Sequence, residues 1–185
     1  MDVVHVLTNV AILFLVVLLV NLSTSIYMSY SNPHIPFIKT QTFNISLALL
    51  ECAERKMPLV PWYKIEKCVR KIELYHVSNG HVPYTRGSLR ASVPTAYVLK
   101  NIVPRSFYAQ KSVFTTTLYK RLDIVSQALV IVHECAHLAL DVDDIAYYWQ
   151  EHFKHLTPEE HLDNADSYMY EMAAHCIDRG TMAIE

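Results

Sequence analysis

The stretch VHECAHLALDVDDIAYYW, residues 132–149, places His133 and His137 four positions apart, with Glu134 directly after the first histidine. On a helix, residues four apart lie on the same face, so the two imidazoles can reach one metal ion. Glu134 can reach a water molecule on that metal without being a ligand itself. The surrounding residues are apolar, and burying two histidines and a glutamate among them is costly unless a metal satisfies them. The pattern therefore predicts a zinc site rather than a chance pair of histidines.

A catalytic zinc needs a third protein ligand and an open position for water. The metzincin arrangement would require Gly at position 140 and His at position 143, where this chain has Leu140 and Asp143. From the residues alone the third ligand stays open, and His152 and His155 are expected on an exposed polar face instead. The remaining candidates are carboxylates of the following loop and of the last predicted helix: Asp141, Asp143, Asp144, Glu159 and Glu160.

The segment DDIAY, residues 143–147, resembles the Asp-x-x-Tyr part of the signature of aspzincins, the deuterolysin-like and peptidyl-lysine metalloendopeptidases. The resemblance implies that Asp144 is the third zinc ligand. It also implies that Tyr147 donates a hydrogen bond to the oxyanion of the transition state. The family has Gly-Thr ahead of its Asp, where this chain has other residues, so Asp143 remains an alternative ligand.

A second segment, NADSY at residues 164–168, is similar to the Asn-Ala-Asp-Ser segment on the last helix of lysine-specific aspzincins. The resemblance implies that Asp166 contributes to substrate binding. Those relatives carry a second acid three residues later, where this chain has Met169, so a preference for lysine is not expected. The alternative role for Asp166 is to hold the last helix and the active-site loop together.

Length and composition indicate one compact domain. The chain has 185 residues, of which 52% are hydrophobic and 18% charged, with a formal net charge of −2 and three glycines. Such a chain is long enough to bury a core and too apolar to be disordered. It has no basic block, so nucleic acid is not expected as a partner.

Helical patterns dominate the predicted secondary structure. Residues 44–56 and 62–76 are predicted as a helical hairpin, split by the proline-containing segment MPLVP. Short strands are predicted within TAYVLKNIV (residues 95–103) and SVFTTTLY (residues 112–119).

Two further helices are marked by their N-terminal residues. Asp123 is the expected N-cap of the helix that carries HExxH. Thr157, Pro158 and Glu160 predict a capping box for a last helix that ends near Gly180. The expected fold is therefore α+β and mainly helical. The resemblance to aspzincins implies more specifically a zincin-like metalloprotease domain, with a small β-sheet ahead of the HExxH helix. An N-terminal hydrophobic helix is expected in addition.

The N-terminus carries a hydrophobic segment. Residues 3–29 contain no formally charged residue and are long enough to span a bilayer as a helix. The expected organisation is a signal anchor or cleaved signal peptide at 1–29, a linker at 30–39 and a metallopeptidase domain at 40–185. The domain is then lumenal, extracellular or secreted, and two glycosylation sequons, at Asn21 and Asn44, agree with this.

Four cysteines allow two disulfides. An antiparallel hairpin of residues 44–56 and 62–76 would bring Cys52 level with Cys68. Cys135 and Cys176 are then the second possible pair, with ordinary buried thiols as the alternative.

The function expected from these features is hydrolysis of peptide bonds by a zinc endopeptidase, with Glu134 as general base and a protein or peptide as substrate. If uncleaved, the N-terminal segment adds the membrane as a partner. One alternative is a catalytically inactive, zinc-stabilised surface-binding protein of the same fold, which the presence of Glu134 disfavours. Another is a two-histidine, one-carboxylate iron enzyme, which the intervening Glu disfavours.

Overall fold

The computed structural model describes residues 12, 14–16, 19, 36–76, 95–98 and 112–177. The chain divides into two compact units, residues 1–33 and 34–185. Most of the predicted hydrophobic helix lies outside the described residues, and its five described positions have helical backbone. Within the part of the chain that is described, no helix is both long and apolar enough to cross a membrane. The predicted anchor or signal segment therefore stays a prediction.

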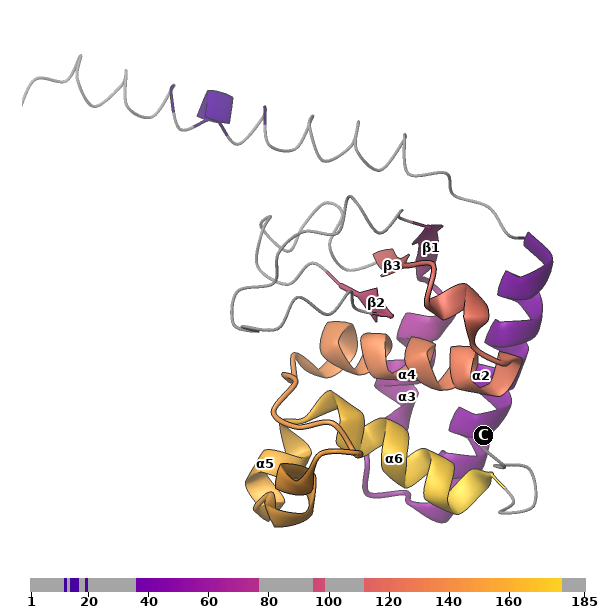
Figure 1. Cartoon of the computed structure of the whole chain (residues 1–185), viewed down its shortest axis with the longest axis vertical. Coiled ribbons are helices and arrows are strands. Elements are labelled where there is room, and N and C mark those ends of the chain that lie inside the picture. Colours follow the sequence, from indigo (N-terminus) through magenta and orange to yellow (C-terminus); the bar gives the residue numbers. More distant parts are fainter. Residues whose placement is uncertain are drawn as a thin grey trace, which may run out of the picture. The chain divides into compact units, whose positions relative to one another are not determined.

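The body, residues 34–185, is mainly helical with one small sheet, which confirms the predicted α+β class (Figure 1). Its elements, in chain order, are helices α2 (Pro36–Lys56) and α3 (Trp62–Val69), strands β1 (Glu73–His76), β2 (Ala96–Tyr97) and β3 (Ser112–Thr115), the 3-10 turn η2 (Tyr119–Arg121), helix α4 (Ile124–Leu140), the 3-10 turn η3 (Glu151–His155), and helices α5 (Pro158–Leu162) and α6 (Ala165–Cys176).

The sheet has the strand order β1-β3-β2, with β1 parallel and β2 antiparallel to the central strand β3. Strands β2 and β3 lie inside the two segments predicted as strands. The predicted helix over 62–76 is wrong at its end, because residues 73–76 form β1. Pairing with β3 overrides the helical pattern there, and Tyr75 stacks on Phe114 of β3 with ring centroids 5.7 Å apart.

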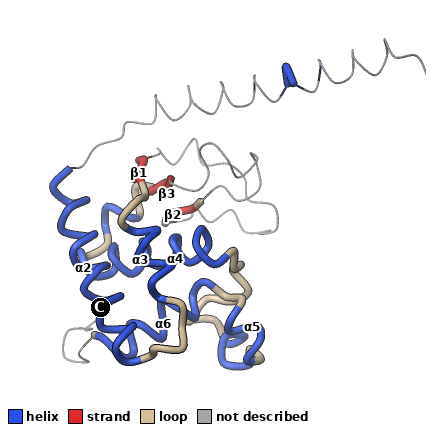
Figure 2. The backbone as a smooth tube through the Cα atoms, turned by 180° about the vertical axis from the view of Figure 1, so that it is seen from behind, coloured by secondary structure: helices blue, strands red, loops and turns tan. Residues whose placement is uncertain are grey.

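Helix α4 lies in the middle of the body, with the sheet on one side and α6 on the other (Figures 1 and 2). It also packs against α2 and α3. Asp123 caps its N-terminus as predicted, accepting hydrogen bonds from the backbone N–H groups of Val125 and Ser126. The segment from Ile131 to His137 is buried throughout, so the HExxH motif belongs to the interior of the body.

The predicted disulfide pairs are wrong. The disulfide joins Cys52 of α2 to Cys176 at the end of α6, with the Cα atoms 5.9 Å apart. Cys68 and Cys135 carry free thiols. The two thiols lie close together, because α3 packs against α4. Burial and this contact with Cys68 raise the pKa of the Cys135 thiol.

The last predicted helix is in fact two helices. The capping box of Thr157 and Glu160 is present as predicted, but α5 ends after five residues. Asp163 and Asn164 interrupt the helix before α6 begins at Ala165. The reason is tertiary, since the backbone at this interruption pairs with the loop after α4 instead of continuing the helical ladder.

Candidate metal centre

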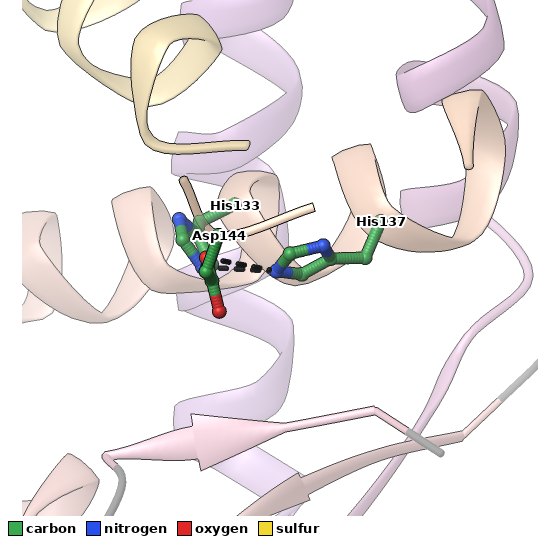
Figure 3. Close-up of side chains that lie close together, drawn as sticks. All are labelled: His133, His137 and Asp144. Atoms are coloured by element: carbon green, nitrogen blue, oxygen red, sulfur yellow. Dashed lines mark hydrogen bonds and ion pairs between the residues drawn. The ribbon is translucent and has the colours of Figure 1, made fainter. Parts of the chain in front are cut away.

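Three side chains meet on one face of α4. His133 and His137 project from successive turns of the helix, and Asp144 reaches them from the loop that follows (Figure 3). Asp144 Oδ1 lies 3.1 Å from His133 Nε2 and 3.2 Å from His137 Nε2. The two Nε2 atoms are themselves 3.2 Å apart. The three potential ligand atoms thus form a nearly equilateral triangle.

This triangle has the size that a tetrahedral zinc ion requires. Ligands about 2.0–2.1 Å from a tetrahedral zinc lie about 3.3 Å from one another. The observed separations are 3.1 to 3.2 Å. Two imidazole nitrogens and one carboxylate oxygen are also a donor set that zinc accepts, and three protein ligands leave one tetrahedral position open. The residues present therefore fit a zinc ion.

The other ring nitrogens of both histidines are anchored. Nδ1 of His137 donates to the carbonyl oxygen of Val142 at 2.7 Å. Nδ1 of His133 faces Oδ1 of Asp166 at 3.3 Å. Both Nδ1 atoms face acceptors, so they carry protons and leave each Nε2 for the metal. Such partners fix the ring orientation and strengthen the nitrogen as a ligand.

The loop that carries Asp144 is held by the start of α6. The chain turns out of α4 at Asp141, which has a positive φ of 64°. Two backbone hydrogen bonds then follow, from Asp143 N to the carbonyl of Asp163 and from Ala165 N to the carbonyl of Asp143, each 2.9 Å long. The position of Asp144 is therefore set by pairing with a segment some twenty residues later.

The buried side chain of Asn164 completes this attachment. Its Oδ1 accepts hydrogen bonds from the N–H groups of Ile145 and Ala146, at 3.0 and 3.3 Å. Its Nδ2 donates to the carbonyl of Ala146 and to Ser167 Oγ, at 2.9 and 3.0 Å. All four bonds are inside the protein, so the amide holds the loop directly after Asp144 in one conformation.

Of the candidate third ligands, Asp144 is the one that lies with the two histidines. Asp143 is adjacent in sequence, but its backbone pairs with the α5–α6 junction. Glu160 uses its carboxylate to cap α5. His152 and His155 lie in η3 with exposed side chains, as expected.

Glu134 follows His133 in the chain and is buried. It is close enough to His133, His137 and Asp144 to interact with their charges. Burial raises the pKa of its carboxyl, and the neighbouring His133 and His137 oppose that rise. A carboxylate with a raised pKa next to a metal site has the properties of a general base that can also return a proton.

The carboxylates around His133 favour the protonated form of its ring. Burial lowers the pKa of His133, but hydrogen bonds to the carboxylates of Asp144 and Asp166 outweigh this effect and raise it to about 10. Burial raises the pKa of Asp144, and the two histidines more than reverse that and hold it well below its usual range.

Tyr147 lies at the edge of the same cluster. Its hydroxyl donates to Asp144 Oδ2 at 3.3 Å. Its ring stacks on that of His133, with centroids 6.3 Å apart and planes at 20°. Burial and the negative charge of Asp144 raise the pKa of Tyr147, so its hydroxyl is a proton-bearing donor at neutral pH.

Asp166 uses both oxygens within the protein. Oδ1 faces His133, and Oδ2 accepts the backbone N–H of Tyr148. The side chain is 2% exposed. This geometry corresponds to the alternative role of joining α6 to the active-site loop. Sequence reasoning missed Asn164, although the NADSY segment containing it was the available signal.

Comparison with known proteins agrees with the geometry. The model of the aspzincin family, described as "Lysine-specific metallo-endopeptidase", matches residues 64–172, which is more than half of the chain. No curated protein and no solved structure matches significantly. The resemblance seen in the segments DDIAY and NADSY is confirmed, and the chain belongs to the aspzincin family of zinc-dependent metallo-endopeptidases.

Proposed function

We propose that this protein is a zinc-dependent endopeptidase whose metal ligands are His133, His137 and Asp144. The observation that carries the proposal is the triangle of Nε2, Nε2 and Oδ1 atoms with sides of 3.1 to 3.2 Å. Glu134 lies beside this triangle, where a peptidase needs its general base.

Zinc, when bound, polarises a carbonyl group and lowers the pKa of water from about 15.7 to about 7. The Glu134 carboxylate accepts a proton from the attacking water and later delivers it to the leaving amine. Its burial supports this role, because burial raises the pKa of the carboxyl and so makes the carboxylate a better base.

Tyr147 is the proposed donor to the oxyanion. Its hydrogen bond to Asp144 is long, at 3.3 Å, so the hydroxyl can exchange it for a stronger bond to a negatively charged oxygen. A donor aimed at the developing charge typically contributes about 10²–10³ in rate.

The substrate backbone is proposed to pair with an edge of the sheet. Strands β1 and β2 are the edges, and β2 packs against α4, which carries Glu134. An extended peptide added to an edge strand gains main-chain hydrogen bonds independent of its sequence.

We also propose that the domain is lumenal, extracellular or secreted. Its Cys52–Cys176 disulfide is typical of oxidising compartments. The apolar segment at residues 3–29 is the proposed signal or anchor, and Asn44 lies on the exposed side of α2, where a glycan can be accommodated.

The test is cleavage of a peptide library by the purified protein, with Glu134→Gln as the matched control. We expect cleavage by the wild type alone, loss of cleavage with a chelator and its return with added zinc. A folded, zinc-loaded wild type that cleaves no peptide would instead favour an inactive binding protein of the same fold.

A further inference from the structure

A cluster of aromatic rings begins at the metal site with the half-buried Tyr147 and continues to rings that are exposed. Tyr147 and Trp149 are stacked in parallel, with centroids 4.7 Å apart and planes at 4°. Tyr148 meets Trp149 edge to face at 5.0 Å and stacks on Tyr170 of α6 at 6.1 Å. We call these four residues, Tyr147, Tyr148, Trp149 and Tyr170, the aromatic ledge.

The ledge is exposed although it is apolar. Trp149 is 65% exposed, Tyr148 40% and Tyr170 42%. Scattered exposed apolar residues are ordinary, but a connected patch commonly marks a binding surface. The buried Phe153 also packs edge to face on Tyr170, with ring centroids 5.3 Å apart. The surface is therefore preorganised for a ligand.

The ledge is continuous with the metal cluster. The first of its rings, Tyr147, stacks on His133 and donates to Asp144. A peptide whose carbonyl lies at the cluster therefore has a neighbouring side chain beside the ledge. Aromatic faces bind large apolar side chains with additional stabilisation when the ring geometry is edge-to-face or offset.

Asp166, the acid that the family resemblance assigns to substrate binding, is not available to an ammonium group. Asp166 has both oxygens engaged with His133 and Tyr148 and is 2% exposed. One helical turn further on, Met169 contributes no charge. A lysine side chain would thus give up its hydration without gaining an available carboxylate from Asp166.

We propose that the aromatic ledge makes this enzyme selective for a large apolar side chain, preferably aromatic, next to the scissile bond, and not for lysine. This inference rests on the proposed endopeptidase function. Trp149, the most exposed ring of the ledge, is the residue that contributes most to the selectivity.

The first measurement is kcat/KM of the full chain on matched peptides that differ only in carrying Phe, Lys or Ala on either side of the cleaved bond. We expect the Phe peptide to be preferred over the Lys peptide by about tenfold or more at one of the two positions. Trp149→Ala should lower kcat/KM for the Phe peptide by about 2–10-fold, the loss of one aromatic contact, and less for the Ala peptide. Tyr63→Ala, an exposed tyrosine on α3, is the matched control.

The second measurement is binding to the Glu134→Gln variant, which does not depend on turnover. The chain has two tryptophans, and Trp62 is buried while Trp149 is exposed. Binding of the Phe peptide should shift the emission of Trp149 to shorter wavelength, whereas the Lys peptide should require a higher concentration. Trp149→Phe removes this signal and keeps an aromatic ring on the ledge.

The outcomes separate the two proposals. Absence of cleavage with tight, Phe-selective binding would refute the endopeptidase function and leave the ledge as an apolar binding site. Cleavage with a lysine preference, or an equal loss on every peptide in Trp149→Ala, would overturn the ledge proposal and leave the endopeptidase standing.

Discussion

At the scale of single residues, the site depends on which of two adjacent aspartates faces the histidines. Asp144 points its carboxylate at both Nε2 atoms, while the backbone of Asp143 is tied to the α5–α6 junction. A shift of one residue would exchange the two side chains, so the backbone pairing of Asp143 decides the identity of the proposed ligand.

The pair Asp144→Asn and Asp143→Asn tests this assignment. We expect Asp144→Asn to weaken zinc binding by more than about 100-fold, because loss of a direct ligand should exceed the 10–100-fold effect of outer partners. Asp143→Asn keeps the backbone pairing and should bind zinc nearly as the wild type does. Competition with a fluorescent chelator measures both, and equal losses in the two variants would contradict the assignment.

Asn164 is predicted to stabilise both the fold and the zinc site. Asn164→Ala removes four internal hydrogen bonds and leaves backbone groups of Ile145 and Ala146 without their partner. We expect a loss of about 2–4 kcal/mol in the free energy of unfolding and weaker zinc binding. Denaturant unfolding checks this, with the exposed Asn44→Ala as control, and a variant as stable as the wild type would refute it.

Zinc binding should release protons. Without zinc, the His133 ring carries a second proton and a positive charge below about pH 10, because its pKa is raised from 6.5 to about 10. Zinc must displace this proton, so the apparent affinity should rise with pH up to that value. Calorimetry in buffers of different ionisation enthalpy measures the proton count. Binding at pH 7.5 without proton release would show that His133 is already neutral.

At the scale of elements, α4 is the support of the whole site. Its histidines face the loop and α6, and Cys135 on its other face contacts Cys68 of α3. Helix α6 contributes Asn164 at its N-cap and Asp166 in its first turn. The position of α6 relative to α4 therefore controls both the loop and the orientation of His133.

The disulfide between α2 and α6 stabilises that arrangement. It closes a chain separation of 124 residues. Replacing Cys52 and Cys176 together by serine should lower the free energy of unfolding by about 2–5 kcal/mol. Thermal unfolding measures the change, and Cys68→Ser, which leaves the disulfide intact, is the comparison.

Peptide mapping tests the pairing itself. A 52–176 crosslink is expected, together with a partly exposed free thiol at Cys68 and a thiol at Cys135 that reacts slowly until the protein is denatured, because Cys135 is buried. A crosslink between Cys52 and Cys68 would instead restore the pairing predicted from the hairpin.

At the scale of the whole body, residues 34–185, zinc would join α4 to the loop that directly follows it, and backbone pairing ties that loop to the start of α6. A metal bound only by the folded state should add about 2.7 kcal/mol of stability at a free concentration 100 times its Kd. Differential scanning calorimetry with zinc and with a chelator measures this, and equal melting temperatures would contradict a zinc site of these residues.

Short-range interactions along the chain determined the helical metal-binding motif and the helix N-termini of this protein. Three predicted features depend only on neighbours within a few residues, and each is present. They are the helical spacing of His133, Glu134 and His137, the Asp123 cap and the capping box at Thr157. Short-range rules of helix geometry and hydrogen bonding are sufficient for such features.

Only the tertiary structure decided the rest. Four features depend on contacts between distant segments: the Cys52–Cys176 pairing, the end of α3 ahead of β1, the interruption at Asn164 and the engagement of both Asp166 oxygens. The sequence pattern restricts those contacts weakly, because many pairings of helices bury a similar apolar area. The packing of α6 against α4 and α2 selects one pairing, and that packing places Asp144 with the histidines and the aromatic rings beside them.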